Sequence, residues 1–239
     1  MSARGPAPPE GAPIRDRVAW VLDRIAEAER LSGRPPGAVK LVAVSKTQPL
    51  SRVREAHAAG LSVFGENYVQ EAEEKIPALP GAEWHLIGKL QGNKVRKAVS
   101  LFAWIQTADS AKRLSEISRC AIEAGRVVPV LIEVNLGGEE SKAGVSPEDL
   151  GNAVAASLRF PGVRVEGLMA IPPYSEDPEA ARPYFGRLRE LRDRVARETG
   201  AALREMSIGM SGDFEAAIGE GATMVRVGTA IFGSRRGRG

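Results

Sequence analysis

The chain has 239 residues, a formal net charge of +3 and one cysteine, Cys120. This length suits one large α/β barrel or two small domains, and a single cysteine excludes an intrachain disulfide or a cysteine-based metal site and fits a reducing compartment. Because no apolar run approaches membrane-spanning length and opposite charges alternate along residues 187–194, we expect a cytoplasmic protein with no membrane and no nucleic-acid partner.

In chain order, residues 1–12 are rich in Pro, Gly and Ala, and we expect a disordered N-terminal segment that is not a secretory signal. A helix is predicted to begin at Pro13, and eight short apolar runs then alternate with helical patterns. The predicted strands are residues 40–45, 62–64, 84–87, 103–106, 130–135, 164–169, 205–208 and 224–227. The order of strands and helices contains no linker that would mark a second domain.

Several of the intervening helices carry start or stop signals. Such signals are a small polar residue before the first turn, a proline in that turn and a glycine after the last turn. The residues that provide them are Ser110 and Gly125, Ser146 and Pro147, Asp177 and Pro178 with Gly200, and Ser211.

Eight strands that alternate with helices predict a single-domain (βα)₈ TIM barrel with an extra N-terminal helix. We assign residues 13–234 to this barrel and residues 235–239 to a short basic tail. The alternative is a doubly wound open sheet. No Gly-x-Gly-x-x-Gly follows the first strand, which disfavours a dinucleotide-binding form of that fold.

Lys46 is the first candidate site residue, because it follows the first predicted strand and is followed by Pro49. Barrels of this kind keep their chemistry at the carboxyl ends of the strands. A partly desolvated amine there loses its proton more readily and can form a Schiff base with an aldehyde. An ordinary solvated lysine at a strand end is the alternative.

Two small-residue loops, after the seventh and eighth predicted strands, are candidates for binding an anion. Ser211 and Gly212 lie in the first loop, and Gly228 and Thr229 in the second. Small residues let backbone N–H groups approach an oxyanion, and these two loops are the recurrent phosphate site of the barrel fold. Ordinary helix capping is the alternative for each loop taken alone.

Arg226 lies inside the last predicted strand, on the same face as Gly228. A buried guanidinium needs an acceptor. A cofactor ring nitrogen would be such an acceptor, and a salt bridge to Glu133 or Glu166 is the alternative. The two histidines have simpler interpretations: His85 as a hydrogen-bonded barrel residue and His57 as a surface residue. With only these two, we expect no metal site.

An aldehyde-reactive lysine, a phosphate cup and an arginine facing a ring together describe a site for pyridoxal 5′-phosphate. The chain resembles the YggS/PROSC family of pyridoxal phosphate homeostasis proteins in several ordered segments. These are VSKT at 44–47, FGENYVQE at 64–71, WHLIGKLQGNK at 84–94, GLMA at 167–170, MSIGMSGDF at 206–214 and VRVGTAIFG at 225–233. The resemblance implies a fold type III barrel, like the cofactor domain of alanine racemase.

The resemblance also implies the cofactor and its contacts. The residues expected to bind pyridoxal phosphate are Lys46 (as the Schiff base), Asn67, Met210, Ser211, Gly212, Arg226, Gly228 and Thr229. Lys142 lies in a polar loop, and its role is open.

The implied function is intracellular pyridoxal phosphate homeostasis and amino-acid balance, without established catalysis. We expect a monomeric carrier or regulator, not an enzyme, with pyridoxal-phosphate-dependent apoenzymes as further candidate partners. An arginine at the ring nitrogen leaves a weaker electron sink, which favours this interpretation. A small amino-acid racemase that uses Lys46 with a water or Tyr68 is the alternative, and a Schiff-base aldolase acting on sugar phosphates is a third.

Overall fold

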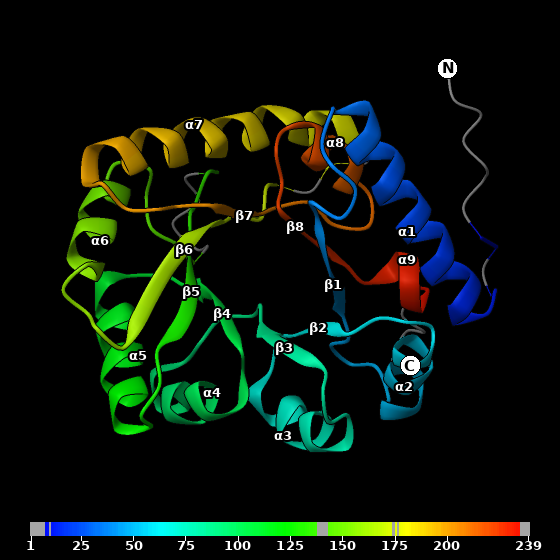
Figure 1. The fold of residues 1–239 in the computed structure, drawn as a ribbon, viewed down its shortest axis with the longest axis horizontal. Helices are drawn as coiled ribbons and strands as arrows, with labels where there is room; N and C mark the ends of the chain where they lie inside the picture. The colour runs from blue at the N-terminus through cyan, green and yellow to red at the C-terminus, as the bar shows by residue number, and fades with distance from the viewer. Residues whose placement is uncertain (1–7, 10, 138–142, 174, 176, 235–239) are drawn as a thin grey trace.

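A computed structural model describes residues 8, 9, 11–137, 143–173, 175 and 177–234. Its eight parallel strands pair in sequence order and close into a barrel, as the sequence predicts. Figure 1 shows the barrel surrounded by helices, with α1 lying beside α8 and α9. The extra N-terminal helix is therefore part of the outer layer.

The strands are β1 (Lys40–Val44), β2 (Val63–Glu66), β3 (Glu83–Leu86), β4 (Trp104–Ala108), β5 (Val128–Glu133), β6 (Val163–Met169), β7 (Glu205–Ser207) and β8 (Met224–Val227). The α-helices are α1 (Ile14–Leu31), α2 (Leu50–Ala58), α3 (Val69–Ala78), α4 (Val95–Leu101), α5 (Ala111–Glu123), α6 (Leu150–Ser157), α7 (Arg182–Thr199), α8 (Phe214–Gly219) and α9 (Thr229–Phe232). Two 3₁₀ turns, η1 (Gly92–Lys94) and η2 (Pro178–Ala181), precede α4 and α7.

Some helix signals have the expected structural roles, and others, such as Ser146, do not. Ser110 accepts a hydrogen bond from the N–H of Arg113, and Gly200 ends α7 with a φ of 71°. Ser146 does not begin a helix. Its hydroxyl accepts a hydrogen bond from the Asp149 N–H in a turn, and α6 starts only at Leu150. The predicted disordered segment 1–12 lies mostly outside the described residues, and the basic tail lies wholly outside them.

The apolar core has two parts because strand residues alternate between the barrel interior and the helices. The large part lies between the strands and the surrounding helices and includes Phe64 stacked on Trp84. The small part, inside the barrel, contains Leu131, Met169 and Met224 with Trp104 packed against them. Buried polar side chains, among them His85, Gln106, Ser207 and Arg226, also lie in the described interior, and this polar set leads to the candidate site.

Strand register places the candidate loops next to each other. Val42 of β1 pairs with Arg226 of β8, and Val44 pairs with Gly65 of β2. A Cβ added at Gly228 would lie 3.4 Å from the Cβ of Val44, so the ends of β1 and β8 are in close contact. The loops after β1, β2 and β8 therefore meet at one mouth of the barrel.

The described helices include none that is both long enough and apolar enough to cross a membrane. The same residues contain no group of three or more His, Cys, Asp or Glu that could hold a metal ion.

Candidate functional site

Lys46 lies two residues beyond the end of β1 and is half-buried. Alternation from Val42 and Val44, which face the interior, directs Lys46 toward the mouth of the barrel. Ser45, on the opposite face, is fully buried against β2, where its N–H donates to the carbonyl of Gly65 (3.0 Å). Thr47 follows with a φ of 61°, the only positive φ among the described residues other than glycine.

Arg226 is 4% exposed and is held by acceptors that are mainly backbone carbonyls. Its Nη1 donates to the carbonyl and to the hydroxyl of Ser207 (2.7 Å each), and its Nη2 donates to the carbonyl of Ala170 (3.0 Å). Burial lowers the pKa of Arg226 to about 10, so the guanidinium stays charged at neutral pH. A salt bridge to Glu133 or Glu166 is therefore not what holds it. Glu166 pairs instead with Arg164.

Arg226 is one end of a hydrogen-bonded chain that crosses the barrel interior. The Ser207 hydroxyl donates to Oε1 of Gln106 (2.7 Å), and Nε2 of Gln106 contacts Nδ1 of His85 (2.7 Å). Because an amide nitrogen only donates, Nδ1 accepts, and the proton of neutral His85 lies on Nε2. That nitrogen donates to Oε1 of Glu83 (2.7 Å).

This series of hydrogen bonds ends at the mouth formed by the amino ends of the strands, where Lys40 also donates to Oε1 of Glu83 (2.9 Å). His85 is fully buried, and burial lowers its pKa, which keeps the ring neutral. The hydrogen bond from His85 is the largest cause that lowers the pKa of Glu83 to about 2. Every donor in the chain thus points from the Arg226 cation toward the Glu83 anion. The prediction that His85 is a hydrogen-bonded barrel residue is confirmed.

The loop after β7 crosses to the start of α9. Oγ of Ser211 accepts hydrogen bonds from the N–H groups of Gly228 and Ala230 (3.2 Å each). Ser211 therefore does not cap α8. It bridges the two small-residue loops, and its own O–H remains to be donated. Asp213 closes the same turn by accepting from the N–H of Met210 (2.5 Å).

The remaining predicted residues lie around these groups. Thr229 and Gly212 are exposed, Met210 is half-buried, and Asn67 follows the end of β2. A Cβ at Gly88 would lie 2.4 Å from the carbonyl oxygen of Asn67, so only glycine lets the loop after β3 approach Asn67 this closely. Lys142 lies outside the described residues.

Sequence reasoning missed a buried polar cluster behind Lys46. Lys75 of α3 is 6% exposed and lies between Glu66 and Glu71. In the sequence, Glu71 and Lys75 have the spacing of an ordinary surface ion pair on a helix, so nothing signals their burial. The only available hint is Glu66 itself, because a charge that ends an apolar strand needs a partner.

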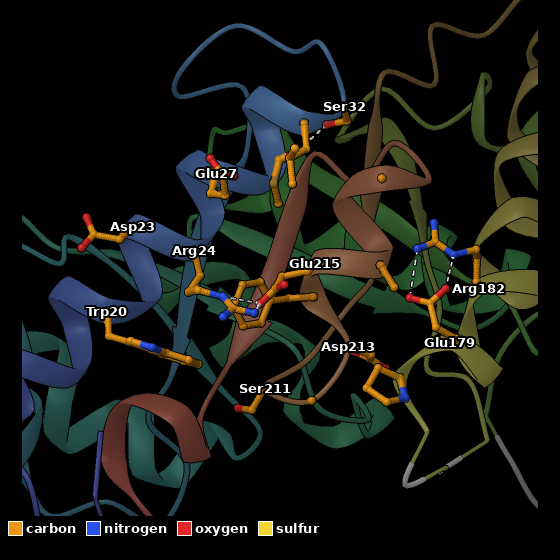
Figure 2. A pocket seen from close by; sticks show the side chains of 17 residues that line it. Trp20, Asp23, Arg24, Glu27, Ser32, Glu179, Arg182, Ser211, Asp213 and Glu215 are labelled. Carbon is orange, nitrogen blue, oxygen red and sulfur yellow. Dashed lines mark hydrogen bonds and ion pairs between the residues drawn. The ribbon is translucent and has the colours of Figure 1, made fainter. Parts of the chain in front are cut away.

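A cavity of about 910 Å³ lies outside the barrel, between α1, η2 and α8. Figure 2 shows Trp20 and Arg24 of α1 facing Ser211 and Glu215 across it, with Arg24 paired to Glu215. The cavity touches the loop 211–213 from its outer side. Lys46, Asn67, Arg226 and Thr229 do not line it, so it is distinct from the mouth that gathers the predicted site residues.

The chain is similar to proteins of one kind over nearly its whole length. The family model of the alanine racemase N-terminal domain matches residues 21–236. A pyridoxal phosphate homeostasis protein of Aquifex aeolicus is 48% identical over 223 residues, which cover 92% of this chain and 98% of the relative. A protein of the same name from Pseudomonas aeruginosa is 45% identical over 93% of this chain and 96% of the relative.

Solved structures agree with this similarity. PipY of Synechococcus elongatus, solved with pyridoxal phosphate bound, superposes with a TM-score of 0.80 at 38% identity and covers 92% of this chain and 100% of its own. Alanine racemase of Clostridium difficile superposes with a TM-score of 0.71 at 13% identity. The match covers 93% of this chain but 57% of the racemase, and at this identity it indicates the fold alone.

Proposed function

The chain belongs to the family of pyridoxal phosphate homeostasis proteins, and on that premise we propose that it binds pyridoxal 5′-phosphate through Lys46 and acts in the homeostasis of this cofactor. The observation that carries the proposal is the meeting of Lys46, Arg226 and the Ser211–Gly228 contact at one mouth of the barrel. We further propose a monomer of the cytoplasm whose partners include apoenzymes that depend on the cofactor.

The donor set at this mouth fits the cofactor in its chemistry. Pyridoxal phosphate supplies an aldehyde, a pyridine nitrogen and a phosphate dianion. Lys46 offers an amine for the aldehyde, and the Ser211 hydroxyl with the Thr229 side chain offers donors for the phosphate. Arg226 offers a charged donor for the ring nitrogen, and the chain through Ser207 and Gln106 fixes its orientation. Asn67, Met210, Gly212 and Gly228 complete the proposed contacts.

A carrier role is favoured over catalysis by the charge and the exposure of the groups at the mouth. A guanidinium that stays protonated disfavours a second proton on a ring nitrogen beside it, and an unprotonated ring is a poorer electron sink. Tyr68, the candidate second acid for a racemase, is 53% exposed. A water-accessible phenol is poorly placed to hold one proton against one face of a substrate. A slow racemase remains the second candidate function.

Borohydride reduction followed by peptide mapping tests the attachment. The purified protein incubated with pyridoxal phosphate should carry the reduced adduct on Lys46, and Lys46→Ala should lose most of it. An adduct mainly on Lys89 or Lys94, with Lys46 unmodified, would contradict the assignment. A racemisation assay with L-alanine and L-serine on the same sample separates the two candidate functions, because a carrier should give no turnover above that of free pyridoxal phosphate.

A further inference from the structure

Lys75 carries a buried ammonium group that donates to three acceptors, and the residue is only 6% exposed. Its Nζ donates to Oε1 of Glu66 (2.7 Å), to Oε2 of Glu71 (2.8 Å) and to the backbone carbonyl of Ser45 (2.8 Å). Glu66 is fully buried at the end of β2, and Glu71 lies one turn before Lys75 on α3. The cluster thus joins α3 to the ends of two strands from outside the barrel wall.

The same cluster holds the backbone on both sides of Lys46. Before it, the hydroxyl of Ser45 donates to Oε1 of Glu66 (2.7 Å), and the carbonyl of Ser45 accepts from Lys75. After it, the N–H of Thr47 donates to Oε2 of Glu71 (2.7 Å). This second contact ties down a β-branched residue in the left-handed region, where such a residue is strained. Lys46 is thereby fixed between two anchors that face away from the mouth.

Stability alone does not account for burying these charges. A buried ion pair is often no more stable than apolar side chains of the same volume. Oε2 of Glu66 has no hydrogen-bond partner among the described residues, and burial raises the pKa of Glu66 despite the Lys75 contact. An arrangement that costs free energy and leaves an acceptor unmet is expected where geometry matters more than stability.

We propose that Lys75 is a positioning residue for Lys46. By binding Ser45, Glu66 and Glu71 at once, it fixes the backbone that carries Lys46 and so directs that amine into the barrel mouth. The inference rests on the proposed function, because it assigns the fixed geometry to covalent capture of the cofactor aldehyde. Lys75 itself binds Ser45, Glu66 and Glu71 from outside the barrel wall, so its proposed effect on the cofactor is indirect.

The test uses the full-length protein and two ways of loosening the segment. Lys75→Met combined with Glu66→Gln removes both buried charges together, so that neither is left uncompensated. Glu71→Ala removes the Thr47 anchor while leaving the Lys75–Glu66 pair in place. Lys97→Met is the matched control. Lys97 pairs with Glu73 on the exposed side of the α3–α4 contact. This pair includes neither Ser45 nor Thr47, the two residues that flank Lys46. Circular dichroism checks that every variant is folded.

Hydrogen exchange of the protein without cofactor gives the first readout. The peptide that covers residues 45–48 should exchange at least about tenfold faster in both loosened variants than in the wild type and the control, because its anchored amides are released. Unchanged exchange would overturn the proposal, whatever the cofactor does. This readout does not depend on Lys46 being the attachment site.

Binding gives the second readout. Pyridoxine 5′-phosphate has the ring and the phosphate but no aldehyde, so its affinity reports on the mouth without covalent capture. The loosened variants should lose about tenfold to a hundredfold in the yield or rate of borohydride-trapped adduct on Lys46, and less than about twofold in affinity for pyridoxine 5′-phosphate. Equal losses for both ligands would overturn the positioning role. A wild-type protein with no adduct on Lys46 would instead overturn the proposed function.

Discussion

At the scale of single residues, Arg226 shows how an interior position selects its partners. The sequence left two acceptors open, a carboxylate of the barrel or a ring nitrogen. In the structure the guanidinium binds the carbonyls of Ser207 and Ala170 and forms no salt bridge to a carboxylate of the described residues, while the ring nitrogen stays a predicted acceptor. Carbonyls accept from some of its N–H groups without neutralising its charge, so the positive electrostatic potential of the guanidinium is kept at the mouth. A carboxylate partner would have cancelled that potential.

Ser211 and Thr229 lead to a prediction at the same scale. Ser211→Ala and Thr229→Val should each weaken pyridoxal phosphate by about 10- to 150-fold, which corresponds to about 1.5–3 kcal/mol for a donor to a charged oxygen. Unphosphorylated pyridoxal should lose much less. Titration of both ligands by their absorbance measures the difference, and Ser100→Ala on α4 is the control. Equal losses for the two ligands would place the phosphate elsewhere.

Among single residues, the sequence indicates site residues whose charge is unusual for their position in a strand. It does not indicate residues whose role depends only on how helices pack on strands. Lys46 and Arg226 were identified because a charged residue inside an apolar strand, or at its end, costs free energy to bury and needs a partner. Lys75 did not stand out because a helix of mixed charge carries many such lysines. Its burial follows from the docking of α3 on β1 and β2, which no local pattern encodes.

At the scale of elements, the turn after β1 stores strain beside the proposed attachment site. Thr47 is exposed and has a φ of 61°, a conformation that Asn tolerates far better than a β-branched residue. Thr47→Asn should therefore raise the free energy of unfolding by about 0.5–1 kcal/mol in urea titrations of the protein without cofactor. Thr47→Val keeps the branched Cβ and should leave the stability near that of the wild type. A loss of stability in Thr47→Asn would show that the threonine side chain stabilises this turn.

Elements were predicted well where burial alone decides and less well where a turn competes with a helix. All eight strands are present, with bounds that differ from the prediction by at most two residues, because a strand buried on both faces is largely apolar. The start of α6 was misplaced because Ser146 and Pro147 suit a β-turn as well as a helix N-terminus. Here residues 146–149 form a turn, and the helix begins after it, at Leu150.

At the scale of the whole molecule, the polar chain from Arg226 to Glu83 connects the two mouths of the barrel. Its members come from β3, β4, β7 and β8, so it exists only when those strands have one register. The position of His85 in a predicted strand indicates that it is buried, but no sequence pattern pairs it with Gln106. Such a chain depends on closure of the barrel and is beyond any prediction made segment by segment.

The neutral state of His85 makes the stability of the whole molecule depend on pH. Burial lowers the pKa of His85 below its usual 6.5, so the unfolded chain takes up a proton at this residue before the folded protein does. Stability from this source is complete above pH 6.5 and is lost as the pH falls toward the folded pKa. Glu83, whose pKa is lowered to about 2, adds a further loss as the pH falls from 4.5 toward that value.

Three carboxyl groups change the stability in the opposite direction as the pH falls. The pH prediction must therefore be measured as a difference between two proteins. Burial raises the pKa of Glu66, Glu133 and Asp213, so protonation of these groups favours the folded state as the pH falls. The net slope is therefore mixed, and the test is a difference. From about pH 7.5 to about pH 5.5, the free energy of unfolding of the wild type should fall relative to that of His85→Gln. Parallel curves for the wild type and His85→Gln would mean that His85 accepts a proton in the folded barrel, and that the donors of the chain do not all point toward Glu83.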